Sequence, residues 1–323
     1  MDRNLALEFA RVTEAAAIAS ARWMGLGDRN AADQAAVDAM RKALDKIHFE
    51  GTVVIGEGER DEAPMLYIGE KVGARGPGAP KIDLALDPLE GTNLCALGHY
   101  DSITVIAAAE NGSFLHAPDT YMDKVAVGSD CRGRLKYEMP TAEKLKAVAE
   151  CKQKPLSDVT VVVLDRPRHE KLIAECRASG VRIKLIGDGD VSAAVSAAMP
   201  GTGVDILLGT GGAPEGVIAA AALRCLDGDF LGKLMWRNDN EKERAAKMGI
   251  RDLDRVYGIE DLARGHVMFS ASGVTDGSWL DGVHFNAGGC TTNSIVMRSQ
   301  TRTIREIRTR HVFESKPGFE GRT

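Results

Sequence analysis

Carboxylates, a glycine and a hydroxyl group gather in one short segment of the sequence, residues 87–92. Asp87 and Glu90 follow the apolar residues 84–86, and Gly91 and Thr92 come directly after them. Carboxylates held within a few ångströms repel each other and raise each other's pKa, and a bound divalent cation removes that cost. Hard oxygen ligands favour Mg²⁺ or Mn²⁺ over Zn²⁺. The segment therefore predicts a metal site in which the Thr92 hydroxyl orients a metal-activated water.

Other acidic positions earlier in the chain could contribute to the same site. Asp33 lies at the start of an expected helix, and Glu57, Glu59 and Asp61 follow an expected apolar strand. Taken alone, Asp33 is better interpreted as a helix cap, and the acids after the strand as a solvated loop. Strand carboxyl ends, however, are where α/β folds place their chemistry.

Glu215 follows the glycine-rich segment 209–212, and Pro214 precedes it. Proline suits the first turn of a helix, where the helix dipole keeps a carboxylate ionised. Glu215 alone could be only a dipole-stabilising acid, but the glycines also free backbone N–H groups to face a ligand. The segment is not a dinucleotide fingerprint, because Pro214 fills the third glycine position.

A basic segment follows the expected strand 158–164. Arg166, Pro167 and Arg168 precede an expected helix. Two guanidinium groups at a helix start form a phosphate-binding arrangement. An ordinary charged helix cap is the alternative. The segment predicts a site for a phosphate that is held rather than cleaved.

Polar residues suited to a sugar occur in two further segments. Asp188, Gly189 and Asp190 form a turn after the expected strand 181–186. Their carboxylates would repel phosphate and suit sugar hydroxyls. Tyr121 offers an apolar ring with a phenol that could reach a phosphate or a hydroxyl, although a buried core tyrosine is an equal alternative.

Hydrophobic periodicity indicates the elements that position these residues. The first part of the chain predicts two helices followed by strands, with a turn at residues 111–112 joining two of the strands. Beyond residue 140 helices and strands alternate, which argues for a parallel sheet. The expected helices are 4–24, 33–48, 141–151, 168–179, 190–198 and 214–225, and the expected strands are 52–55, 81–86, 102–109, 124–127, 158–164, 181–186, 204–208, 267–270, 294–298 and 302–311. Residues 236–262 are polar, and we expect them on the outside, as a candidate oligomer contact.

The composition is that of a soluble globular enzyme. The 323 residues carry a net charge of -5, with 44% hydrophobic and 27% charged residues. Scattered Lys and Arg argue against a nucleic-acid partner, and no apolar run is long enough for a membrane span. We expect a cytoplasmic protein with free cysteines, a disulfide being the less favoured alternative.

Several segments together resemble one family, the class II fructose-1,6-bisphosphatases of the lithium-sensitive sugar-phosphatase superfamily. The resemblance extends over residues 1 to 312 and is carried by segments 56–69, 87–92, 117–124, 166–169, 188–190 and 211–216. It implies an α/β fold, the layered α+β sugar-phosphatase fold. An N-terminal metal-binding phosphatase domain, 1–138, would precede a C-terminal α/β domain with a largely parallel sheet, 139–323. The active site would lie between the two domains.

The resemblance also implies roles for single residues. Asp33 and Glu57 match the ligands of one metal, and Asp87, Glu90 and Glu215 match those of a second. The matched substrate contacts are Glu90, Gly91, Thr92, Tyr121, Arg166, Pro167, Arg168, Asp188, Gly189, Asp190 and Gly212. Thr92 is the expected catalytic residue, with Glu59 and Asp61 as candidates for proton relay. Arg29 and Ala31 depart from the family, which commonly has Lys and Thr there.

The implied activity is hydrolysis of the 1-phosphate of fructose 1,6-bisphosphate, in gluconeogenesis, with two or more Mn²⁺ or Mg²⁺ ions. A homo-oligomer, dimer or tetramer, is expected. The residues leave alternatives open. A dual enzyme would also cleave sedoheptulose 1,7-bisphosphate. An inositol-phosphate-type monophosphatase would not need the 166–169 segment, and a non-catalytic sensor would not need water-activating groups.

Overall fold

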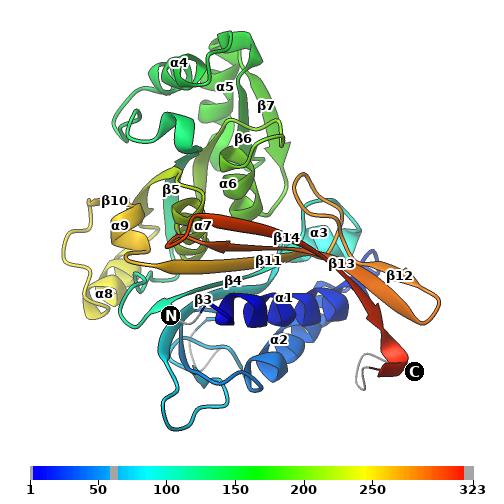
Figure 1. Ribbon diagram of the computed structural model, residues 1–323. Coiled ribbons are helices and arrows are strands. Elements are labelled where there is room, and N and C mark those ends of the chain that lie inside the picture. The colour runs from blue at the N-terminus through cyan, green and yellow to red at the C-terminus, as the bar shows by residue number, and fades with distance from the viewer. Residues whose placement is uncertain (1–2, 59–64, 316–323) are drawn as a thin grey trace. The chain divides into compact units, whose positions relative to one another are not determined.

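The computed structural model describes residues 3–58 and 65–315 and has mixed α/β content, as predicted (Figure 1). The chain divides into two compact units. Unit 1 comprises residues 1–111 and 268–323, and unit 2 comprises residues 112–267. This division differs from the two consecutive segments, 1–138 and 139–323, that we expected. Strands that follow residue 267 return to the first sheet, and pairing between strands so distant in sequence leaves no local signal.

Unit 1 is built on one sheet. Its strand order is β12-β13-β11-β4-β3-β1-β2, and β14 pairs with β13. β1 and β3 are parallel. β3 pairs antiparallel with β4, and β13 pairs antiparallel with β11, β12 and β14. The strands are β1 (Glu50–Ile55), β2 (Lys71–Val72), β3 (Lys81–Glu90), β4 (Ile103–Glu110), β11 (Val267–Gly273), β12 (His284–Asn286), β13 (Gly289–Arg298) and β14 (Thr303–Val312), and the helical segments are α1 (Leu5–Ala21), α2 (Arg29–Leu44), α3 (Thr92–Leu97) and η4 (Phe313–Ser315).

Helix α1 packs between α2 and the strands of unit 1, and the two helices run side by side in Figure 1. Its residues Phe9, Val12 and Ala16 are buried, and the Phe9 ring meets the Phe49 ring edge to face at 5.8 Å. Burying a large apolar side chain contributes about 1.5–3 kcal/mol. This packing fixes the helices on the sheet and, with them, the acids that they carry.

Helix α2 begins four residues earlier than predicted. Asp28 is its N-cap and accepts a hydrogen bond from the backbone N–H of Ala31 at 3.0 Å. The polar residues at its start hid this turn from a search for apolar periodicity. Asp33 therefore lies inside the helix, and its interpretation as a cap is wrong.

Unit 2 also contains one sheet, with the order β10-β9-β5-β8-β6-β7. β8, β6 and β7 are parallel, as the alternation predicted, whereas β5 is antiparallel to β8 and β9, and β10 is antiparallel to β9. The strands are β5 (Tyr121–Val127), β6 (Thr160–Leu164), β7 (Arg182–Ile186), β8 (Ile206–Gly212), β9 (Asp229–Met235) and β10 (Val256–Gly258). The helical segments are η1 (Ser129–Cys131), α4 (Thr141–Cys151), η2 (Leu156–Asp158), η3 (Pro167–His169), α5 (Glu170–Ala178), α6 (Asp190–Ala198), α7 (Ala213–Cys225), α8 (Asp239–Lys247) and α9 (Ile259–Leu262).

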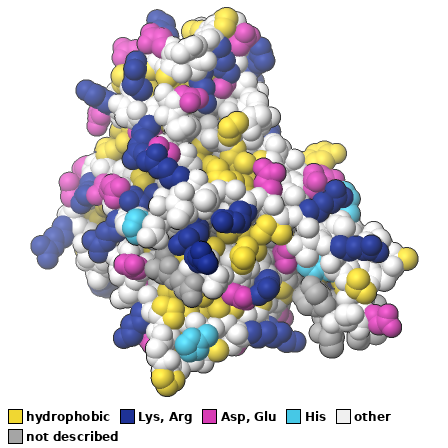
Figure 2. Space-filling model, viewed as in Figure 1, with side chains coloured by type: hydrophobic (Ala, Val, Ile, Leu, Met, Phe, Trp, Pro, Cys, Tyr) yellow, Lys and Arg dark blue, Asp and Glu magenta, His cyan; other side chains and the backbone are white. Residues whose placement is uncertain are grey.

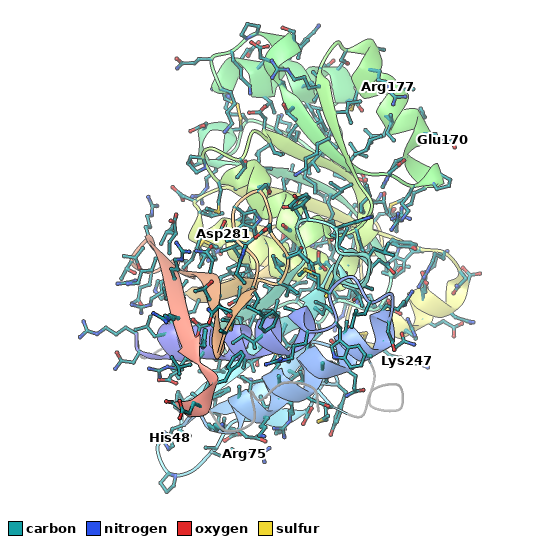
Figure 3. The ribbon with its side chains drawn as sticks, turned by 90° about the vertical axis from the view of Figure 1, so that its right-hand side faces the viewer. His48, Arg75, Glu170, Arg177, Lys247 and Asp281 are labelled. Atoms are coloured by element: carbon teal, nitrogen blue, oxygen red, sulfur yellow. A yellow bond between two sulfur atoms is a disulfide. The ribbon has the colours of Figure 1, made fainter. Side chains whose placement is uncertain are left out.

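Two local expectations change. The turn at residues 111–112 does not join a hairpin, because β4 and β5 belong to different sheets. The polar segment 236–262 contains α8, β10 and α9. Glu170 and Arg177 of α5 and Lys247 of α8, labelled in Figure 3, are exposed charged residues, typical of the outer faces of such helices.

The expectation that all cysteines are free is wrong for two of them. Cys131 and Cys151 form a disulfide between η1 and the end of α4, whereas the other four cysteines are buried thiols. The bridged cysteines lie 20 residues apart in sequence. No short spacing motif marks such a pair, since the fold of unit 2 brings them together.

Charged side chains of both signs lie on the surface. On the face shown in Figure 2, Lys and Arg side chains are interspersed with Asp and Glu. The expected strand 302–311 corresponds to β14, and Arg305, Arg308 and Arg310 are exposed on it. Within residues 3–58 and 65–315, no helix is both long and apolar enough to cross a bilayer.

Candidate active site

Three acids of unit 1 converge where two parallel strands end. Glu57 follows β1, and Asp87 lies near the end of β3, the parallel neighbour of β1. Parallel strands bring their carboxyl ends to the same edge of a sheet. Asp33 reaches this edge from α2. The charges of Asp87 and Asp33 both act on Glu57, so these three acids, distant in sequence, lie near one another. Their role as metal ligands stays a prediction.

The electrostatics of these acids show how tightly they are grouped. Burial, followed by the charges of Asp87 and Asp33, raises the pKa of Glu57 to about 8. Burial also raises the pKa of Asp33, although the Arg29 guanidinium and a hydrogen bond from Thr92 act in the opposite direction. Carboxylates that raise one another's pKa in this way gain most from a cation between them.

The turn that ends β3 positions the remaining groups. The backbone N–H of Leu89 donates to Asp87 Oδ1 at 2.9 Å, and Glu90 is buried. Gly91 has a φ of 79°, in the left-handed region that favours glycine, and precedes α3. Thr92 Oγ1 donates to the Leu89 carbonyl at 3.0 Å. Its single proton cannot also serve Asp33, so these two acceptors compete for it.

The donor set of unit 1 fits a hard divalent cation. Its ligands would be carboxylate oxygens, which Mg²⁺ and Mn²⁺ prefer. Such an ion would offset the repulsion between these buried acids. In the described part of the chain, no group of three or more Asp, Glu, His or Cys side chains is arranged so that it could hold a metal ion. The predicted candidates Glu59 and Asp61 lie outside the described residues.

The predicted residues of unit 2 gather at one end of its sheet. Because β8, β6 and β7 are parallel, the segments that follow them come to the same edge. β5 runs the opposite way and begins there, with Tyr121 paired to Gly212 on one side and Met235 on the other. The residues that follow these strands are Arg166, Pro167, Arg168, Asp188, Gly189, Asp190 and Glu215.

Glu215 lies in the first turn of α7, as predicted. Burial raises its pKa, and the ammonium group of Lys124 partly offsets this effect. Its Oε2 atom is buried and has no hydrogen-bond partner among the described residues. A Cβ on Gly212 would lie 1.9 Å from that atom, so only glycine leaves it room. An unpartnered buried carboxylate oxygen is costly.

Lys124 is a buried cation that the sequence analysis did not single out. Its side chain is 1% exposed, and its Nζ donates to Asp190 Oδ2 at 2.6 Å. Lys124 lies in the middle of β5, between Asp123 and Val125, where a lysine would ordinarily be interpreted as facing solvent. It neutralises part of the acidic charge of Asp190 and Glu215.

Arg168 and His169 join the segment after β6 to the end of β8. Arg168 donates to the Thr210 carbonyl through Nε at 3.0 Å and Nη2 at 2.8 Å. His169 is buried, with Nδ1 2.7 Å from the Leu164 carbonyl, and Nε2 accepts from the Thr210 N–H at 2.7 Å. An N–H that donates to Nε2 requires that nitrogen to be unprotonated, so the ring is neutral. Burial accordingly lowers the pKa of His169.

Asp188 and Gly189 lie in the turn that precedes α6. The Gly189 N–H donates to Asp188 Oδ1 at 3.1 Å, and Asp188 is half-buried. The Arg168 guanidinium lies 4.7 Å from the centre of the half-buried Tyr121 ring. The interpretation of Tyr121 as a buried core residue is therefore not supported.

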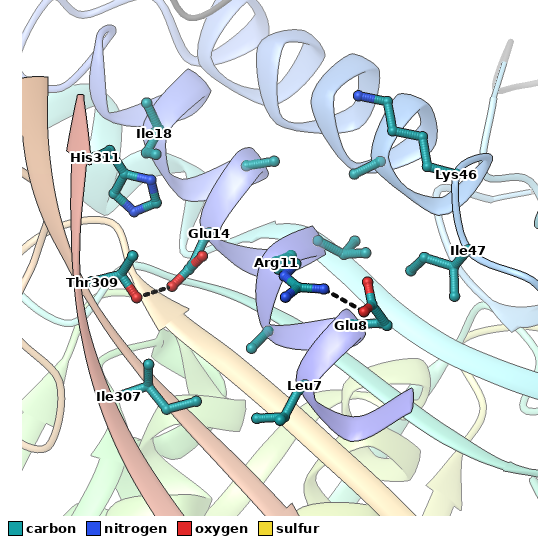
Figure 4. Close-up of a pocket in the computed structure, with 14 residues that line it drawn as sticks. Leu7, Glu8, Arg11, Glu14, Ile18, Lys46, Ile47, Ile307, Thr309 and His311 are labelled. Atoms are coloured by element: carbon teal, nitrogen blue, oxygen red, sulfur yellow. Dashed lines mark hydrogen bonds and ion pairs between the residues drawn. The ribbon is translucent and has the colours of Figure 1, made fainter. Parts of the chain in front are cut away.

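A large hollow of unit 1 lies apart from these residues. Figure 4 shows this groove, of about 690 Å³, between α1, the end of α2 and β14. Glu14 lies in it and accepts a hydrogen bond from the Thr309 hydroxyl at 2.5 Å. None of the predicted site residues lines it. We place the candidate site at the acids rather than at the groove, because phosphate ester hydrolysis depends on converging polar groups and none of the predicted groups lines the groove.

Comparisons with known proteins agree with the chemistry of these residues. The family model described as bacterial fructose-1,6-bisphosphatase, glpX-encoded, matches residues 3–311. The chain belongs to this family. The resemblance inferred from the sequence segments is thus confirmed.

Similar proteins carry the name D-fructose 1,6-bisphosphatase class 2/sedoheptulose 1,7-bisphosphatase. The protein from Trichodesmium erythraeum (strain IMS101) is 48% identical, and the match covers 97% of each chain. That from Synechocystis sp. (strain ATCC 27184 / PCC 6803 / Kazusa) is 47% identical over 98% of each chain. That from Microcystis aeruginosa (strain NIES-843 / IAM M-2473) is 46% identical over 97% of this chain and 98% of its own.

Proposed function

We propose that this protein hydrolyses the 1-phosphate of fructose 1,6-bisphosphate to give fructose 6-phosphate and phosphate, a step of gluconeogenesis. The observation that carries the proposal is the convergence of Asp33, Glu57 and Asp87 in a protein of the fructose-1,6-bisphosphatase family. Uncompensated buried acids suit a metal that binds a phosphate ester. The sugar bisphosphate is the substrate class of the family.

Five acids are our candidate ligands for two or more Mn²⁺ or Mg²⁺ ions. They are Asp33, Glu57, Asp87, Glu90 and Glu215. Bound there, the ions would neutralise the phosphate to be cleaved and lower the pKa of a water molecule. The buried, unpartnered Oε2 of Glu215 supports the inclusion of that residue.

The other candidate residues bind and orient the substrate. Thr92 aims the attacking water, and its hydroxyl donates its one proton either to the Leu89 carbonyl or to Asp33. Arg166 and Arg168 hold the phosphate that is not cleaved, because guanidinium groups match phosphate oxygens in charge and geometry. Gly91 and Gly212 let the backbone approach the substrate, and Asp188 and Asp190 accept hydrogen bonds from sugar hydroxyls. Positioning and charge neutralisation supply most of the rate enhancement in phosphoryl transfer.

The test is phosphate release from fructose 1,6-bisphosphate by chelator-treated protein, with Mn²⁺, Mg²⁺ and other divalent ions added in turn. We expect release only with an added ion, and fructose 6-phosphate as the sugar product. Release of phosphate without any divalent ion would refute the metal-dependent assignment. No release with any ion would refute the activity.

A second activity is favoured by the names of the relatives, which include sedoheptulose 1,7-bisphosphatase. The longer sugar requires the same metal ligands and phosphate contacts, so we propose that it is a substrate as well. Turnover of the two bisphosphates under identical conditions tests this. A sedoheptulose 1,7-bisphosphate turnover at the background rate would restrict the enzyme to the shorter sugar.

We further propose that the protein acts in the cytoplasm as a homo-oligomer, a dimer or a tetramer. Sugar bisphosphates are highly charged and remain in the compartment where they are made. Light scattering of the purified protein measures the oligomeric state, and a monomeric mass would refute the oligomer.

A further inference from the structure

Two guanidinium groups lie against the ring of Tyr121 in unit 2. The Arg168 guanidinium carbon is 4.7 Å from the ring centre, and that of Arg237 is 5.1 Å from it. The two cations are therefore within about 10 Å of each other. Arg168 comes from the segment after β6, whereas Arg237 follows β9 on the opposite side of β5.

Arg237 is held in place by the start of helix α8. Asn238 is the N-cap and accepts from the Glu241 N–H at 3.0 Å. The Glu241 carboxylate reaches back, accepting from the Arg237 backbone N–H at 2.8 Å and from its Nε. This reciprocal arrangement is close to a capping box, shifted by one residue.

The carboxylate that anchors Arg237 is itself built into the fold. Glu241 is 4% exposed, and its Oε2 also accepts from the Thr120 hydroxyl at 2.8 Å. Thr120 directly precedes Tyr121 on the chain. The anchor, the ring and the guanidinium group are thereby tied together, which a surface arginine that only caps a helix would not require.

The anchored side chain keeps donors available. Arg237 is 48% exposed, and besides Glu241 it makes one long contact, from Nη2 to the Asp119 carbonyl at 3.4 Å. Within the described residues, Nη1 of Arg237, Nη1 of Arg168 and the Tyr121 hydroxyl have no hydrogen-bond partner. Two like charges and a phenol on one ring form an arrangement that a phosphate dianion would stabilise.

We propose that Arg237 binds the phosphate of the substrate that is not hydrolysed, jointly with Arg168 and Tyr121, and that Glu241 is its positioning residue. This proposal rests on the proposed function for the identity of the substrate. It assigns to the segment 236–247 a role in substrate specificity, where its polar sequence suggested an outer surface. The enzyme would prefer bisphosphates to sugar monophosphates because this phosphate meets preorganised guanidinium groups.

The decisive comparison is Arg237→Ala with Arg244→Ala. Arg244 is a matched control, since it donates to the same Asp119 carbonyl, at 2.9 Å, without stacking on Tyr121. Loss of a charged hydrogen bond predicts a fall of about 10- to 100-fold in kcat/KM for fructose 1,6-bisphosphate in Arg237→Ala, carried mainly by KM. With fructose 1-phosphate, which lacks the second phosphate, Arg237→Ala should match the wild type. Arg244→Ala should match it with both substrates.

An equal fall with both substrates, or no fall with either, would overturn the proposal. Should Arg237→Ala fail to fold because Glu241 is left buried and unpaired, the double variant Arg237→Met with Glu241→Gln removes that charge and carries the same test. Calorimetric binding of fructose 6-phosphate separates this proposal from the proposed activity. Its Kd should rise about 10- to 100-fold in Arg237→Ala, whether or not the wild type releases phosphate. An unchanged Kd would refute the role of Arg237.

Discussion

Burial raises the pKa of acids in both units, but among the described residues only the acids of unit 2 have a buried lysine beside them. In unit 1, the neighbours Asp87 and Asp33 add to burial and raise the pKa of Glu57 to about 8. In unit 2, burial and the charge of Asp190 raise the pKa of Glu215, and the ammonium group of Lys124, which binds Asp190, partly offsets this effect. One group of acids lacks sufficient cationic charge, and the other contains its own cation.

This difference separates two tasks. A group of acids without enough positive charge suits a divalent cation, whereas a group with a buried lysine and nearby arginines suits an anionic substrate. The folded chain tolerates the first group at a cost in stability, as functional sites commonly do. Within the second group, Lys124 neutralises Asp190, whereas Glu215 keeps a buried carboxylate oxygen without a hydrogen-bond partner among the described residues.

The largest expected effect on stability comes from removing the internal cation of unit 2. Lys124→Met leaves Asp190 buried without its partner, which predicts a loss of about 3–5 kcal/mol in the free energy of unfolding. Urea denaturation measures it. The double variant Lys124→Met with Asp190→Asn should recover most of the loss. A single variant as stable as the wild type would contradict the assigned role of Lys124.

A change of opposite sign is expected in unit 1. Because the pKa of Glu57 is raised in the folded state, its contribution to stability is present below the unfolded pKa of 4.5 and declines as the pH rises toward 8. In chelator, Glu57→Gln should match the wild type near pH 5 and exceed its stability by about 1–2 kcal/mol above pH 8. Denaturation curves at the two pH values measure this. Glu50→Gln, on the strand that precedes Glu57, is the control. An equal pH dependence of stability in the wild type and in Glu57→Gln would remove the contrast between the units.

The smallest effect concerns His169, whose pKa is lowered by burial. The contribution of a group with a lowered pKa of this kind is present above the unfolded value of 6.5 and is lost as the pH falls below it, because the unfolded chain then binds the proton more readily. A one-unit difference in pKa between the two states corresponds to about 1.4 kcal/mol. We expect His169→Gln to flatten the acid side of the stability profile measured by thermal unfolding. A profile that remains unchanged would show that His169 does not sense pH.

Local sequence patterns predicted much of this arrangement. Helices 141–151 and 190–198 occur at their predicted bounds. Pro140 and Gly189 directly precede them and mark where each helix begins. The acids of the 87–92 segment could be singled out from the sequence, because their residue types and their spacing alone predict a metal site. The predictions that were wrong concern contacts between residues that are distant in sequence. The return of β11–β14 to the first sheet and the Cys131–Cys151 bridge have no local signature.

The residues that were missed have a different explanation. Lys124 and Arg237 look like solvent-facing charges in the sequence, because a single lysine in a strand or a single arginine after one is ordinary. Only burial reveals the first, and only the stacking on Tyr121 and the anchor Glu241 reveal the second. The spacing of Asn238 and Glu241 was a usable signal, since it is typical of a capped helix start.

Turnover of fructose 1,6-bisphosphate by isosteric variants at saturating Mn²⁺ tests most directly whether acids from the two units serve one metal-dependent reaction. Asp87→Asn and Glu215→Gln should each lose at least about 100-fold in kcat. Asp83→Asn, on the same strand as Asp87 but bonded to Asn111 at 2.8 Å, should retain wild-type turnover. Wild-type turnover by Asp87→Asn or by Glu215→Gln would contradict the account.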